Sequence, residues 1–123
     1  MKIKKVNPLQ WLVEPLESDE SFAQKKMFGA DVVYIGGRQV LAMITGDEPW
    51  NGLLVCTSRE HHESLIQEYP ELSSHAVLGK WLYISQSNKN FEQTAERLTK
   101  QILEGDVRIG IEPKAKARKQ KQK

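Results

Sequence analysis

The residues with the greatest chemical potential form one run, Cys56-Thr57-Ser58-Arg59-Glu60-His61-His62-Glu63. A cysteine beside the first turn of a helix can be held as a reactive thiolate by the helix dipole and by free backbone N–H groups. His61 or His62 would then act as the base. Under this hypothesis the chain is a small thiol-dependent enzyme or redox sensor that uses Cys56 and His62. The alternative is a small core cysteine that ends a buried strand. The spacing favours this alternative, because both histidines lie a turn or more into the expected helix.

The same run contains residue types that bind metal ions. The candidate ligands are Cys56, Glu60, His61, His62, Glu63 and, further along the chain, His75. A metal site needs three or four converging ligands, and the sequence has neither an HExxH motif nor a CxxC pair. Adjacent helical histidines also point about 100° apart, so both cannot easily reach one ion. We therefore expect no metal site, no other cofactor and no catalytic residues.

Two tryptophans are candidates for an interaction surface, because exposed aromatic residues often anchor protein interfaces. Trp11 lies between the apolar positions of an expected helix, and Trp50 lies in an expected loop. The alternative for both is ordinary packing in the core or at its edge. The sequence leaves the two readings open.

The last ten residues, KAKARKQKQK, form a strongly basic tail. Its basic residues are Lys114, Lys116, Arg118, Lys119, Lys121 and Lys123, and it has no acidic residue. Its only apolar residue type is Ala, so it cannot bury enough surface to become ordered, and we expect 114–123 to be disordered. The tail could contact nucleic acid or an acidic partner through its charges, or it could simply be a solubilising terminus.

Length and composition limit the remaining possibilities. The chain has 123 residues, of which 39% are hydrophobic and 28% charged, so we expect one soluble domain at 1–113 followed by the tail. No apolar run approaches the ~18 residues of a membrane-spanning helix, and the N-terminus has no apolar core typical of a secretory signal. With a single cysteine no internal disulfide can form. These features favour a cytoplasmic protein with no membrane partner.

Glycine punctuates the segments that are expected to form a sheet. Apolar and β-branched residues fill 32–35 and 40–44, and Gly36-Gly37 between them suits the tight turn of a hairpin. Further strands are expected at 53–56 and 81–84.

Three helices are expected around these strands. Asn7-Pro8 favours a helix start, and a kink or end is expected at Pro15. Thr57 and Glu60 have the spacing of a capping box at the start of a second helix, which Pro70 ends. A third helix follows Asn88 or Asn90 and ends at Gly105. The element order predicts an α+β two-layer sandwich: a mostly antiparallel sheet of four to five strands with helices on one face.

The segment Lys25-Lys26-Met27-Phe28-Gly29-Ala30, followed by Tyr34 and Gly37, resembles the opening of the N-terminal domain of the competence regulator TfoX. In that family a basic residue precedes Met-Phe-Gly-Gly; here Ala30 replaces the second glycine. The later part, with His75, Lys80-Trp81-Leu82-Tyr83 and a closing helix, is similar in layout to the related YjbR-like proteins. The resemblance implies a compact α/β fold of the secretion-chaperone-like type and transfers no catalytic residue. The second domain of TfoX has no counterpart here beyond the basic tail.

Two hypotheses about function follow. The first is a non-enzymatic binding or regulatory module, dimeric or bound to another protein through a sheet edge or the tryptophans, with nucleic acid as a further partner of the tail. The second is the thiol-dependent protein that uses Cys56 and His62.

Overall fold

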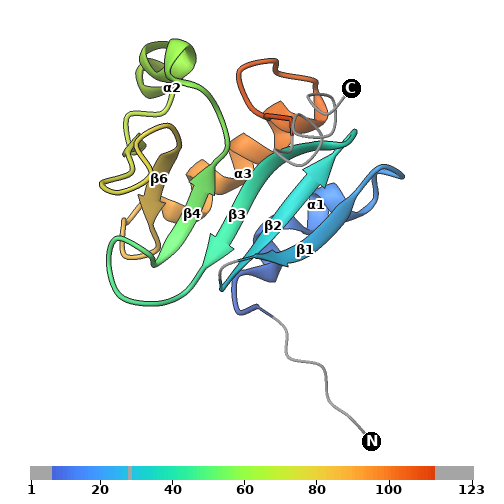
Figure 1. The fold of residues 1–123 in the computed structure, drawn as a ribbon, viewed down its shortest axis with the longest axis horizontal. Coiled ribbons are helices and arrows are strands. Elements are labelled where there is room, and N and C mark those ends of the chain that lie inside the picture. Colours follow the sequence, from blue (N-terminus) through green and yellow to red (C-terminus); the bar gives the residue numbers. More distant parts are fainter. Residues whose placement is uncertain (1–6, 28, 113–123) are drawn as a thin grey trace, which may run out of the picture.

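The computed structural model describes residues 7–27 and 29–112, which are built around one antiparallel sheet. The strands lie in the order β1-β2-β3-β4-β6-β5, and every neighbouring pair is antiparallel (Figure 1). Their bounds are β1 Ala23–Met27, β2 Ala30–Ile35, β3 Arg38–Ile44, β4 Gly52–Val55, β5 Ser73–Ser74 and β6 Leu82–Ser85.

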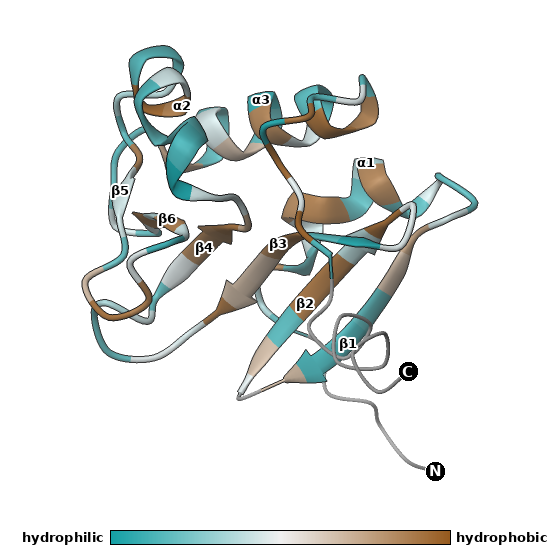
Figure 2. Cartoon of the chain, turned by 45° about the horizontal axis from the view of Figure 1, so that its top comes forward, coloured by the Kyte–Doolittle hydropathy of each residue, from teal (hydrophilic) through white to brown (hydrophobic). Residues whose placement is uncertain are grey.

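The helices are η1 Gln10–Val13, α1 Glu14–Glu17, η2 Arg59–His61, α2 His62–Glu68 and α3 Phe91–Leu103. Helices α1 and α3 cover the same face of the sheet, and α2 lies beyond the end of β4 (Figures 1 and 2). The expected α+β class is therefore confirmed for the described residues.

The expected count of four to five strands was too low, because the sheet has six strands within residues 7–27 and 29–112. Strand β5 has only two residues, both exposed. Strand β1 has the sequence AQKKM and is mostly exposed at the sheet edge, so it lacks the apolar pattern of an internal strand. The sequence signals for both elements are correspondingly weak.

The hairpin between β2 and β3 forms as the glycines predict. Gly36 and Gly37 have φ angles of 62° and 82°, in the left-handed region that only glycine enters without strain. Strand β3 contains an irregularity opposite Val33 and Tyr34, which places both Val40 and Leu41 in the core.

The first helix differs from its prediction. It begins at Gln10 as a 3-10 turn and becomes α-helical at Glu14, with Pro15 in the first α turn, where its missing N–H is tolerated. Asn7 is not its cap. The Asn7 side chain accepts a bond from the Leu9 N–H at 2.8 Å and donates to Asp31 in β2 at 2.8 Å.

The predicted capping box is wrong. Ser58 occupies the N-cap position of η2, but its side chain makes no capping hydrogen bond. The Thr57 hydroxyl donates instead to the Arg108 carbonyl at 2.6 Å. Thr57 is buried under the segment that follows α3, so a contact across 51 residues replaces the expected local one.

Two hydrophobic clusters lie on the two faces of the sheet. The larger one joins the helices to one face, through residues such as Leu12 of η1, Leu65 of α2 and Leu98 of α3. On the other face is a smaller group, which we call the second cluster. Its buried members are Ala30, Val32, Tyr34, Ala42, Leu54 and Tyr83, with Met27, Ile44 and Trp81 partly buried against them.

Candidate functional site

Cys56 follows β4 directly and is completely buried. Its backbone N–H donates to the Val40 carbonyl at 3.0 Å, and its carbonyl accepts from the Gly110 N–H at 2.7 Å. Burial away from water raises the pKa of the thiol far above its usual range, because the charged thiolate is disfavoured there. The residue therefore behaves as a small apolar core side chain at neutral pH.

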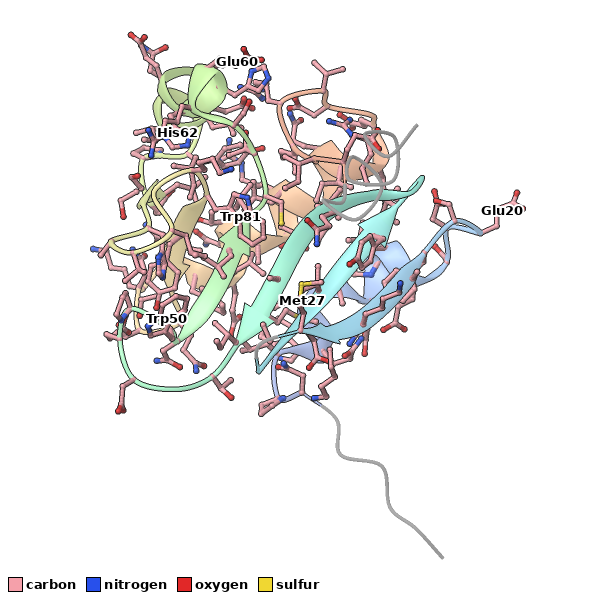
Figure 3. All side chains as sticks on the ribbon, in the orientation of Figure 1. Glu20, Met27, Trp50, Glu60, His62 and Trp81 are labelled. Atoms are coloured by element: carbon pink, nitrogen blue, oxygen red, sulfur yellow. The ribbon has the colours of Figure 1, made fainter. Side chains whose placement is uncertain are left out.

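The two adjacent histidines are engaged elsewhere. Nε2 of His62 lies 2.7 Å from the Lys80 carbonyl oxygen, which ties α2 to the segment before β6. His61 lies 3.3 Å from the carboxylate of exposed Glu60. Within the described residues, no hydrogen bond or ion pair joins Cys56 to either imidazole. Figure 3 shows His62 at α2, above the sheet.

His75 is a buried connector between two loops. Its Nδ1 accepts the backbone N–H groups of Val77 and Leu78 at 3.1 and 3.0 Å. Nε2 must then carry the proton, which it donates to the Pro49 carbonyl at 2.7 Å. The ring also packs against Trp50 at 4.3 Å and against Tyr83 at 5.3 Å between centroids. These contacts fix the loop at 45–51 to the loop at 75–81.

Trp50 is therefore part of a packed corner of the molecule, where it is only partly exposed. Its candidacy as a free interface residue is weakened by its contact with His75. The structure thus brings two sequence candidates, Trp50 and His75, together for packing.

Glu48 anchors the same loop to the sheet, a role that the sequence pattern did not indicate. Its carboxylate accepts from the Tyr83 hydroxyl at 2.7 Å and from the Ser85 hydroxyl at 2.5 Å. The Tyr83 hydroxyl also accepts from the Asn51 N–H at 2.8 Å. Bonds from Ser85 and Tyr83 lower the pKa of Glu48, whereas burial together with the bond to Glu48 raises the pKa of Tyr83 to about 12. Neither group is poised to exchange protons near neutral pH.

Arg108 makes the densest ionic contact of the described chain. Its guanidinium reaches Asp106 and Glu68 at 2.6 Å each and Ser64 at 2.7 Å. The hydrogen bond to Asp106 raises the pKa of Arg108, and the reciprocal bond lowers the pKa of Asp106 to about 2. The cluster attaches α2 to the segment after α3, and its donors and acceptors are used internally.

No group of three or more His, Cys, Asp or Glu side chains in the described residues is arranged to hold a metal ion. The sequence candidates Cys56, His62 and His75 occupy separate places with separate partners.

Trp11 stands out among the sequence candidates because its side chain is 46% exposed. It borders a pocket of about 440 Å³ between η1 and the start of α3. The pocket is lined by Pro8, Leu9, Trp11, Gln86, Asn88, Lys89, Phe91, Glu92 and Gln93. The loop before α3 supplies much of this lining, so the helical pattern around Trp11 could indicate exposure but not a pocket.

The second cluster is the other feature that could receive a partner. All six buried members lie in strands, and Val32, Ala42, Leu54 and Tyr83 form one cross-strand row. Helices α1 and α3 lie on the opposite face (Figures 1 and 2). The uninterrupted apolar runs at 32–35 and 40–44 indicated apolar side chains on both faces of the sheet. A strand with one solvent-exposed face would instead alternate apolar and polar residues.

The basic tail residues Lys114, Lys116, Arg118, Lys119, Lys121 and Lys123 lie outside the described residues. The described residues themselves contain 9 basic and 16 acidic side chains, a formal charge of −7. The overall charge of +2 therefore combines a net negative charge of the described residues with a net positive charge of the remaining ones.

A scan against protein-family models gave no match, and searches of curated proteins and of solved structures gave none either. No helix in the described part of the chain has the length and apolar character needed to cross a bilayer.

Proposed function

We propose that the chain is a non-enzymatic protein-binding module that docks a partner on the sheet face opposite the helices. The observation that carries this proposal is the second cluster, an apolar face to which, within the described residues, the strands and Trp81 contribute. A sheet normally buries its apolar faces against another layer, and the helices of the described chain supply that layer on one side only.

Met27, Ile44 and Trp81 form the accessible part of this face, since they are partly buried while the side chains between them are buried. Met27 comes from β1 and Trp81 from the position before β6, so the three residues span most of the sheet (Figure 3). Met and Trp are side-chain types enriched at protein interfaces.

Part of the resemblance to the TfoX N-terminal domain lies on the same face. Met27, Ala30 and Tyr34 are among the residues that carry the resemblance, and all three belong to the second cluster or pack against it. We also propose that the chain is related to that family and shares its secretion-chaperone-like fold.

We propose a second copy of this chain as the partner, because the partly exposed apolar side chains of one such face can pack against the same residues of another around a two-fold axis. Sedimentation velocity over a wide concentration range tests this. The wild-type chain should dimerise, while Met27→Lys and Ile44→Lys should shift the monomer–dimer equilibrium at least tenfold toward monomer. Leu103→Lys, at an exposed apolar residue of α3 on the other side of the molecule, is the matched control and should leave the equilibrium unchanged.

Circular dichroism of each variant distinguishes loss of dimer from loss of fold. A wild-type chain that stays monomeric at all concentrations would contradict self-association. Variants that are folded and dimerise as strongly as the wild type would show that another surface is responsible.

A further inference from the structure

We propose that the Trp11 pocket is a separate binding site for a short peptide segment containing Lys or Arg. The pocket lies in the helix layer, so this inference does not depend on the proposed use of the opposite sheet face. Its volume of about 440 Å³ falls within the range of ligand sites, roughly 300 to 1,000 Å³.

The apolar part of the pocket is rigidly supported. Leu9 and Phe91 are 3% and 5% exposed, and both belong to the core cluster under the helices. Trp11 lines the same pocket, with nearly half of its surface exposed. An exposed indole next to buried apolar side chains provides a fixed surface on which a ligand side chain can pack.

Several polar groups around the pocket are not used within the described residues. The side chains of Lys89, Glu92 and Gln93 make no hydrogen bond or ion pair there, and neither does the Trp11 indole N–H. Gln86 and Asn88, by contrast, are bonded to Asn51 and to the Asn90 N–H at 2.5 and 2.8 Å. Free carboxamide, carboxylate and ammonium groups can together pair with the amides and charges of a peptide.

The charge around Trp11 favours a cationic ligand. Glu92 lines the pocket, Glu14 follows Trp11 by three residues, and Glu96 follows Glu92 by one helical turn. Among the described residues, Lys89 is the one basic residue of the lining. The described residues as a whole carry 16 acidic against 9 basic side chains. A Lys or Arg side chain would approach the exposed indole face with a cation–π attraction and reach Glu92 at the same time.

Display selection on the full chain with random heptapeptides tests this inference, with counter-selection against Trp11→Ala. Peptides that require Trp11 should be enriched in Lys and Arg over Asp and Glu. Residues 114–123 are themselves basic and could compete with the peptides for the pocket. The selection is therefore repeated on a full-length variant in which the six Lys and Arg residues of this segment are replaced by Gln.

The strongest peptide is then measured by calorimetry. Its affinity should fall at least tenfold in Trp11→Ala, at least threefold in Glu92→Gln, and tenfold when its own Lys and Arg are changed to Gln. Leu103 is an exposed apolar residue of α3 outside the pocket, so Leu103→Ala should leave the affinity for the peptide unchanged.

Each alternative outcome overturns part of the inference. Trp11-dependent peptides without basic enrichment would contradict the ligand class while leaving a peptide site. Selections that yield no Trp11-dependent peptide would remove the site itself. Either result leaves the sedimentation test of the sheet face unaffected, so the two proposals fail separately.

Discussion

Burial and hydrogen bonding decide what the titratable side chains of this chain can do. Cys56 is enclosed, and His62 and His75 each hold a backbone carbonyl. A thiol activated for catalysis needs exposure and a positive neighbour, neither of which the environment of Cys56 provides. His62 and His75 therefore connect segments of the molecule, and the Cys56 side chain packs in the core.

The thiol of Cys56 should react slowly in the folded protein. Burial raises its pKa, so the thiolate fraction stays negligible between pH 7 and 9. We expect iodoacetamide to modify the native chain at least 100-fold more slowly than the urea-unfolded chain, with no change in His62→Ala. Rapid native alkylation with a titration midpoint below ~8.5 would revive the thiol hypothesis.

The Asp106–Arg108 pair should make stability depend on acidity. The folded pKa of Asp106, about 2, lies below its ordinary value of 3.8, so the pair stabilises the fold above pH ~4. That contribution is lost as the pH falls from about 4 to 2, because the carboxylate then becomes protonated in both states. This lowering of the Asp106 pKa corresponds to at most about 2.5 kcal/mol of folding free energy.

Urea unfolding of Asp106→Asn at pH 7 and pH 3 measures this contribution. The substitution should lower the free energy of unfolding by about 1–2 kcal/mol at pH 7 and by clearly less at pH 3. Asp47→Asn, an exposed aspartate, is the control and should change little at either pH. An equal loss at both values of pH would refute the electrostatic explanation.

At the level of elements, local patterns predicted the structure where the deciding contacts are local. Gly36-Gly37 set the β2–β3 hairpin, and the predicted third helix between Asn90 and Gly105 matches α3, which has Asn90 as its N-cap and is followed by Gly105 at a φ of 85°. The Thr57 prediction failed because Arg108, 51 residues away, provides its actual partner. Likewise, the Trp11 pocket needs the loop before α3, whose position no local pattern specifies.

The loop connection through His75 should be worth several hydrogen bonds. His75→Ala would leave the N–H groups of Val77 and Leu78 without their acceptor and remove the packing against Trp50. We expect the free energy of unfolding to fall by about 2–3 kcal/mol, and exchange of these two amide protons to accelerate. His61→Ala, at the surface, should cost less than about 0.5 kcal/mol. Similar costs for both variants would refute the connecting role.

At the scale of the whole molecule, charge separates an acidic body from basic ends. The described residues carry −7, whereas residues 114–123 carry six basic side chains. The net negative charge of the described residues disfavours phosphates overall, so we expect any binding of the chain to nucleic acid to involve its basic ends. The tail holds six of their nine basic side chains, and Lys2, Lys4 and Lys5 are the other three.

Replacing the six basic tail residues by Gln in the full chain tests that proposal. The wild type should bind a 30-nucleotide single-stranded RNA weakly at ~50 mM salt, and the Gln variant should bind at least tenfold more weakly. The affinity of the wild type should also fall steeply with added salt. Equal affinities of the two proteins would eliminate nucleic acid as a partner of the tail.

Nuclear Overhauser measurements on a mixture of isotope-labelled and unlabelled chains test the central claim most directly, because they detect contacts between two copies. If the sheet face docks a second copy, the methyl groups of Met27 and Ile44 should give intermolecular signals to protons of the same face, and Met27→Lys should abolish them. A concentrated sample with no such signals at these methyl groups, or with intermolecular signals confined to another surface, would contradict the account.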